Sequence, residues 1–479
     1  MRDIDKFALE INRNLRGRYK LLTEKTGPYL NIIGIFFHEL MIYLSNYYII
    51  KSSEYTYKED VVFPYLNSKY CNAPFNVQFG QSEQLQSNYK STVIIAIIYF
   101  RNIVNMLFKN RKSISIIHPD LFMATTLIKL PFSYKINLIK NKKVYLKNYE
   151  CQVDFLRDTI DQICIKYDIP CKNIFVENFI NYIKNNISDC ELSSPGEYLL
   201  VESNTLITNR VNSANYLDSG KKVIGVSHGF GYSLQLDDPI MGYGEFSYCN
   251  QYLTFGATTL EFGEYNHSLN EAPKFHRRTS DLLESIYTAN PIIKKSESET
   301  SKILYIPTGY SFNKRYGPFR DIDDQLYNEW QNAIIDHSNN IFYKAYPGQN
   351  KLVNIPDERL IQNDLKTKIH ILNQFDLIII DYFSTISNLV AATDKPIIYF
   401  NLGLMNIALE AKKDFKERVF WCDVDLSKDY SIQVQDGFNK YFRSEQSFIN
   451  TYTKKYCLNN NNMSELDLIK DIIENNSFI

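Results

Sequence analysis

From residue 196 onward, short apolar runs alternate with segments of helical periodicity, and few architectures accommodate such an alternation. Residues 377–380 read Leu-Ile-Ile-Ile without an intervening polar residue, which predicts a strand covered on both faces. Shorter apolar runs at 197–202, 222–227 and 251–255 predict further strands, with a helix expected over 211–217. Strands that alternate with helices form βαβ units and parallel sheets, so the predicted fold class is α/β.

A polar segment at residues 294–301 divides this alternation into two series. After it, apolar strands restart at 301–306, and Ser464 is placed to cap a final helix ending near Asn475. With 479 residues, the chain is long enough for two domains. We expect two Rossmann-like domains, 1–290 with a helical elaboration at its start and 300–479, facing a central cleft.

Charge and cysteine content exclude several classes of protein. Lys and Arg number 53 against 54 Asp and Glu, so the chain lacks the basic excess of a nucleic-acid binder. The 8 cysteines form no C-x-x-C pair and no zinc set, which favours a reducing compartment and no metal. We therefore expect a cytoplasmic protein that needs no nucleic acid and no metal.

Two apolar stretches bear on membranes. Residues 29–50 have helical spacing interrupted by polar residues, which predicts a buried or interfacial helix, and residues 91–109 predict a buried helix. Neither is an uninterrupted apolar run of about 18 residues. The expected relation to a membrane is peripheral, at the inner face of the cytoplasmic membrane.

The strongest chemical signal follows the buried strand at 377–380. Asp381-Tyr382-Phe383-Ser384-Thr385 leaves this strand and opens a helix, so free backbone N–H groups and two hydroxyls gather at one helix start. Such a place suits a phosphate or diphosphate, although Ser384 could simply cap the helix. We take Asp381, Tyr382, Ser384 and Thr385 as candidate donor-binding residues.

A second signal follows the strand at 222–227. His228 stands just past this strand and glycines follow it, which suits a general base or a phosphate contact as well as a structural histidine. Gly229 and Tyr232, in the same loop, are candidates for binding an acceptor. Glu245, ahead of the strand at 251–255, is a candidate catalytic carboxylate.

Two further loops leave strands of the second series. Thr308 and Gly309 leave the first of these strands, and Lys314 follows as a cation for a nucleotide phosphate. Tyr346 and Pro347 leave the next strand. All four groups lie at carboxyl ends of predicted strands, where ligands bind in open α/β sheets.

These segments resemble the GT-B glycosyltransferases of bacterial surface polysaccharide synthesis. His228-Gly229 followed by a strand ending at Gly256 resembles their His-Gly segment, and Asp381 to Thr385 resembles the Asp-Tyr-Ser-Ser phosphate loop of the CDP-glycerol glycerophosphotransferases. Tyr346 stands where those enzymes carry a second histidine. The glycines after His228 and the later Gly244-Glu245 are more similar to Kdo transferases, which use a CMP-activated acidic sugar. Some members of this class use an acidic residue on the strand before the His-Gly strand, and the resemblance makes Glu202 the matching candidate carboxylate here.

The resemblance implies a metal-independent enzyme that transfers a sugar from a nucleotide donor to a capsule, lipopolysaccharide or O-antigen glycan. It implies no cofactor besides the activated donor, expected to carry cytidine, and a glycan or glycolipid acceptor. The alternatives are a glycerol- or ribitol-phosphate transferase, a nucleotide-sugar epimerase on the same scaffold, and a carbohydrate-binding member of an assembly complex without activity.

Overall fold

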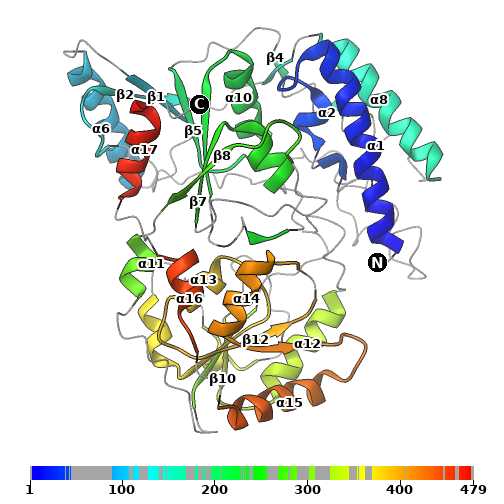
Figure 1. The fold of residues 1–479 in the computed structure, drawn as a ribbon, viewed down its shortest axis with the longest axis vertical. Coiled ribbons are helices and arrows are strands. Elements are labelled where there is room, and N and C mark those ends of the chain that lie inside the picture. Colours follow the sequence, from blue (N-terminus) through cyan, green and yellow to red (C-terminus); the bar gives the residue numbers. More distant parts are fainter. Residues whose placement is uncertain are drawn as a thin grey trace.

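The fold is taken from a computed structural model of the whole chain (Figure 1). The structure describes residues 3–37, 39–41, 44, 89–106, 112–117, 128–139, 144–146, 148–168, 177, 180–181, 187–188, 196–204, 207–227, 229, 231, 234–236, 241–255, 268–278, 281–287, 301–307, 324–344, 353, 355–361, 369–403, 405–445, 448–458 and 463–475.

The described residues form two large parallel sheets, one in each half of the chain. The first has six strands in the order β2 (Tyr134–Ile139), β1 (Lys112–Ile117), β5 (Tyr198–Val201), β6 (Lys222–Val226), β7 (Gln251–Phe255) and β8 (Lys274–Arg278). The second has five, in the order β10 (Ile341–Tyr343), β9 (Ile303–Ile306), β11 (Leu377–Ile380), β12 (Ile397–Asn401) and β13 (Phe420–Asp423). Every pairing between neighbours in both sheets is parallel. The predicted α/β class with two Rossmann-like sheets is confirmed.

Both sheets share one strand order. In each, the chain lays down a first strand, places the second on one side of it, and then continues from the third strand onward on the other side. The order in which the chain adds strands across the sheet therefore reverses between β1 and β5 in the first sheet and between β9 and β11 in the second, although all these strands run parallel. Ligands of open α/β sheets bind at the carboxyl ends of the strands beside such a reversal, so each half has one favoured edge.

Alternate residues of the central strands pack into different cores, which is why these strands are apolar throughout. Leu199 and Val201 of β5 face one cluster, and Tyr198 and Leu200 face another. The first cluster contains residues of α1 (Asp3–Thr26), α2 (Ile32–Ile35), α8 (Tyr149–Lys166) and α10 (Ile207–Asp218); the second contains residues of α6 (Tyr89–Asn105) and α17 (Glu465–Glu474). The first sheet is therefore covered on both faces.

The second sheet is built in the same way. Strand β11 alternates between a cluster with α12 (Asp324–Asp336) and α15 (Tyr430–Arg443) and one with α11 (Asp281–Ile286), α13 (Thr385–Ala391), α14 (Leu409–Arg418) and α16 (Thr451–Tyr456). A small parallel pair, β3 (Val144–Tyr145) and β4 (Ile187–Ser188), and helical turns at Met241–Glu245, Phe246–Tyr248, Asp357–Arg359 and Ile369–Gln374 complete the described elements.

The final helix α17 returns to the first sheet. Ser464 caps it as predicted, by accepting a hydrogen bond from the Asp467 N–H. The Lys112 ammonium and the Tyr198 hydroxyl both donate to the Ile473 carbonyl, over 3.0 and 3.2 Å. Figure 1 shows α17 (red) beside α6 and the strands β1 and β2. Although α17 follows the whole second sheet in sequence, it helps to cover the first.

Two segments of the first half pack, conversely, on the second sheet. Leu283 and Ile286 of α11 belong to the cluster around α13. Residues 234–236 pair antiparallel with 406–408: Leu236 N–H donates to the Asn406 carbonyl and Ala408 N–H to the Leu234 carbonyl, both over 2.9 Å. The predicted boundary segment, residues 290–300, lies outside the described residues, so the division at that point stays a prediction.

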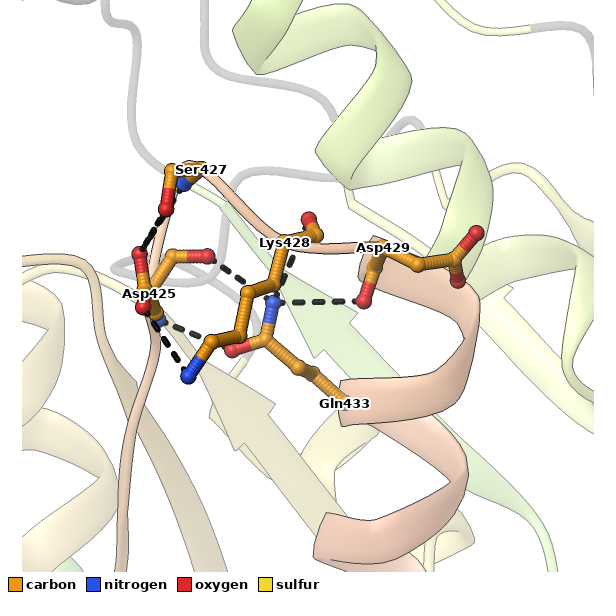
Figure 2. Close-up of polar contacts among 5 residues, drawn as sticks. All are labelled: Asp425, Ser427, Lys428, Asp429 and Gln433. Carbon is orange, nitrogen blue, oxygen red and sulfur yellow. Dashed lines mark hydrogen bonds and ion pairs between the residues drawn. The ribbon is translucent and has the colours of Figure 1, made fainter.

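The loop between β13 and α15 satisfies its polar groups locally (Figure 2). The Ser427 hydroxyl and Lys428 ammonium contact the Asp425 carboxylate over 2.6 and 3.2 Å, and Gln433 Nε2 donates to the Asp425 carbonyl over 2.9 Å. Hydrogen bonds from Ser427, the largest cause, lower the pKa of Asp425 to about 2. The polar contacts that hold this loop in place before α15 are therefore made among its own residues and the first turn of the helix.

Candidate functional site

The start of α13 lies at the reversal point of the second sheet, where β9 and β11 end side by side. Ser384 is the N-cap of α13 and Thr385 its first residue. The Ser384 N–H donates to Ser387 Oγ over 3.1 Å, and the Ser387 hydroxyl donates to the Tyr382 carbonyl over 2.9 Å. Ser384 and Thr385 are only half-buried. Hydrogen bonds among its own residues therefore hold this turn in place, while Ser384 and Thr385 remain partly accessible.

Asp381, directly after β11, is used by the fold itself. It is 1% exposed, and its carboxylate accepts hydrogen bonds from Tyr305 on β9 and from Tyr327 and Trp330 on α12, the last two over 3.1 Å. Burial, and then the charge of Asp381, raises the pKa of the Tyr305 phenol well above its usual range, so the phenol remains a donor. The carboxylate oxygens of Asp381 face these three side chains in the structure, and its contact with a donor stays a prediction.

Tyr382 is also buried, within the cluster on the α12 side of the sheet. Asp381 and Tyr382 are best described as positioning residues that fix the chain between β11 and α13. Of the four candidates predicted here, Ser384 and Thr385 are the accessible ones.

A segment of the first half reaches this helix start. Gly231 has a φ of +80°, a left-handed conformation that glycine adopts easily. A Cβ added there would lie 3.3 Å from the Phe383 ring and 3.5 Å from the Ser384 carbonyl oxygen. The Gln235 side-chain amide donates to the Phe383 carbonyl over 2.7 Å. The loop that carries His228 therefore contacts the residues that lead into α13.

The first residues of that loop are anchored to their own sheet. The Ser227 hydroxyl donates to the Gly229 carbonyl over 2.7 Å, and Arg278 Nη1 donates to the Ser227 carbonyl over 2.8 Å. Arg278 also pairs with Glu465 of α17 over 2.9 Å. Ser227 and Gly229, on either side of His228, are both buried, so the chain is fixed before and after the histidine.

Glu245 lies at the reversal point of the first sheet and is fully buried. Its carboxylate accepts hydrogen bonds from the Ser203 hydroxyl over 2.8 Å and from the Asn204 N–H over 3.0 Å. These donors come directly after β5. Glu202, the neighbouring candidate, is half-buried. The structure thus brings both predicted carboxylates to the end of β5 and gives Glu245 a structural contact there.

A buried ion pair behind this edge was not foreseen. Arg210 of α10 is fully buried, donates to the Asn204 carbonyl over 3.0 Å and pairs with Glu39 over 2.9 Å. Glu39 interrupts the apolar stretch at 29–50, and a carboxylate within an apolar stretch was the sequence signal for a buried ion pair. Because a buried charge needs a partner, the carboxylate implied a basic residue elsewhere in the chain.

The remaining candidates lie outside the described residues, and their roles stay predictions. They are His228, Tyr232, Thr308, Gly309, Lys314, Tyr346 and Pro347. Strands β6, β9 and β10 end just before them, as the sequence predicts. Across the described part of the chain, no cluster of three or more His, Cys, Asp or Glu side chains has the arrangement of a metal site.

Comparison with known proteins gives structural likeness alone. No family model matches the chain, and no curated protein matches it. Among solved structures, it resembles Staphylococcus aureus MnaA in complex with UDP, at a TM-score of 0.41 and 9% identity, over 77% of this chain and 98% of that one. It also resembles the spinosyn rhamnosyltransferase SpnG, at 0.39 and 10% over 76% and 100%, and a UDP-N-acetylglucosamine 2-epimerase, at 0.32 and 11% over 73% and 94%.

Proposed function

We propose that this chain is a GT-B-type glycosyltransferase, which moves a sugar from a nucleotide donor to a glycan or glycolipid of the bacterial surface. The contact between the loop after β6 and the start of α13 carries the proposal. It joins a carboxyl-terminal edge of the first sheet to the reversal point of the second. A reaction between a donor held by one half and an acceptor held by the other needs such a junction.

In this proposal the second half holds the donor. The accessible hydroxyls of Ser384 and Thr385, with the backbone N–H groups around them, bind the diphosphate or phosphate. Thr308, Gly309 and Lys314 follow β9, the strand adjacent to β11, and so leave the same edge of the sheet. Tyr346 and Pro347 follow β10, the next strand along, and complete the donor set.

The first half holds the acceptor, with Gly229 and Tyr232 in the loop after β6. His228 takes the proton of the attacking hydroxyl or orients the leaving phosphate. Glu202 is the carboxylate partner in our assignment, because it keeps solvent access while Glu245 is fully buried against Ser203 and Asn204. Glu245 then positions the end of β5.

From the resemblance to Kdo transferases, we propose a cytidine nucleotide as the carrier and a site of action at the inner face of the cytoplasmic membrane. None of the described helices is both long enough and apolar enough to cross a bilayer. Any membrane association of the described part is therefore proposed to be peripheral.

A thermal-shift screen of CMP, CDP, UDP and GDP tests the proposed donor site. A nucleotide at a hundred times its dissociation constant stabilises the folded state by about 2.7 kcal/mol. For a chain of this size we expect the melting temperature to rise by about 3 °C. Cytidine nucleotides should give the largest rise, and a UDP or GDP preference would indicate an ordinary sugar donor. If none of the four nucleotides raises the melting temperature, the proposed donor site is wrong.

A further inference from the structure

Helix α6 is inverted relative to an ordinary surface helix. Its inward face carries Arg101 and Asn105, which are 2% and 1% exposed, together with Asn102 and one buried apolar residue, Ile98. Its outward face carries large apolar side chains that are 41–64% exposed, Ile97, Tyr99, Phe100 and Ile103, and Met106, directly after the helix, is 65% exposed. A helix that faces water normally buries its apolar stripe and exposes its polar one.

Arg101, Asn102 and Asn105 all donate to backbone carbonyls around the turn before β2, so the orientation of α6 is built into the fold. Arg101 Nη1 donates to the Ile128 carbonyl over 3.0 Å, and Asn102 exchanges two hydrogen bonds with the backbone of Ile136 over 2.7 and 3.0 Å. Asn105 donates to the Phe132 carbonyl over 2.5 Å. These bonds clamp the turn before β2 and fix the rotation of α6 about its axis. The apolar stripe cannot turn inward without breaking them.

Phe132 extends the exposed stripe. It lies at the tip of the clamped turn, is 44% exposed and stacks under the Arg101 guanidinium at 5.1 Å. We call this surface, made by the outward side chains of α6 and Phe132, the α6 face. Helix α6 lies at the outer edge of the molecule beside β2, away from the second sheet (Figure 1). Contiguous apolar surface of this kind marks an interaction site.

The charged residues within α6 and the stretch 128–139 are all basic, although the neighbouring helix α17 carries four acidic residues. Lys129 and Lys135, which flank Phe132 in the sequence, are exposed. Neither α6 nor the stretch 128–139 contains an acidic residue. The partner of this surface is therefore expected to be apolar and negatively charged.

We propose that the α6 face docks the protein on an anionic lipid bilayer. Aromatic and aliphatic side chains enter the boundary between headgroups and acyl chains, while lysines beside them contact anionic headgroups. A second copy of this chain fits less well, since a symmetric contact places the same basic surface against itself. This gives a surface to the membrane association proposed above and requires no catalytic activity.

Vesicle sedimentation of the full chain tests the docking. We expect binding to phosphatidylcholine vesicles that contain phosphatidylglycerol, and at least roughly tenfold weaker binding to phosphatidylcholine alone at physiological salt. The double variant Phe100→Glu/Ile103→Glu should lose roughly tenfold or more of this binding. Lys129→Glu/Lys135→Glu should lose roughly tenfold on anionic vesicles and nothing on neutral ones.

The matched control is Ile165→Glu on α8, which changes an equally large aliphatic side chain at 81% exposure and should leave vesicle binding unchanged. All variants should keep the wild-type circular dichroism and nucleotide thermal shift, which separates this test from that of the donor site. Absence of wild-type binding to anionic vesicles overturns the proposal, as does full binding by Phe100→Glu/Ile103→Glu. Light scattering that shows a dimer which this variant abolishes, without vesicle binding, would assign the face to a second copy instead.

Discussion

Replacing Asp381 with alanine is expected to lower the free energy of unfolding by about 3–6 kcal/mol, because three buried donors lose their acceptor at once. Tyr305, Tyr327 and Trp330 are each at most 1% exposed, so water cannot replace the carboxylate without opening the core. Urea denaturation measures the loss. Trp330, one of two tryptophans in the chain, provides a fluorescence signal at the altered position.

Asp376→Ala is the matched control for this prediction. Asp376 precedes the same strand, is exposed, and accepts one hydrogen bond from the Lys302 N–H over 2.9 Å. Its removal should cost about 1 kcal/mol or less. Equal losses for the two variants would mean that Asp381 does not organise the end of β11.

Replacing His228 with alanine is expected to reduce turnover of the donor identified by the nucleotide screen by roughly 10²- to 10⁴-fold, the range for loss of a general base. The flanking residues Ser227 and Gly229 are buried and bonded to each other, so the loop should keep its course. Nucleotide binding and the melting temperature should therefore change little. Release of nucleotide from the donor, with acceptor present, measures the effect.

His337→Ala controls for the loss of a histidine as such. His337 follows α12 and stacks on Phe438 at 4.3 Å. Its replacement should leave turnover within about twofold of wild type, because His337 lies outside the proposed donor and acceptor sites. Wild-type turnover in His228→Ala would remove the histidine from the mechanism. Consumption of donor without any acceptor would indicate the epimerase in place of the transferase.

The local structure around the candidate site follows from the sequence because each of its signals is short-range. The unbroken apolar run before Asp381 predicts β11, and Ser384 with Ser387 three residues later forms the helix start that the pattern indicates. The burial of Asp381 could not be predicted in this way. Its acceptor role depends on Tyr327 and Trp330, more than 50 residues earlier, and a polar residue after a strand looks the same whether it faces a ligand or a core.

Long-range pairings were equally hidden. The amphipathic pattern and the Ser464 cap predict α17 correctly, but both sheets offer apolar faces, so the pattern cannot say which sheet it covers. The prediction of a buried helix at 91–109 is wrong for the outward face of α6. Apolar content predicts burial of a helix face only when the polar residues of the helix lie on the face that meets water. In α6 the polar residues Arg101 and Asn105 are buried and hydrogen-bonded on the inward face, so most of the large apolar side chains face outward.

The central claim is that a nucleotide binds at the start of α13, and calorimetric titration of two threonine variants tests it most directly. Thr385→Val removes the hydroxyl from the first residue of α13, and Thr393→Val removes one just beyond its end, where it donates to the Val390 carbonyl over 2.6 Å. Loss of one hydrogen bond to a phosphate should weaken binding of the preferred nucleotide by roughly five- to tenfold in Thr385→Val. Thr393→Val should bind as wild type. Equal affinity in both variants and the wild type would contradict the account.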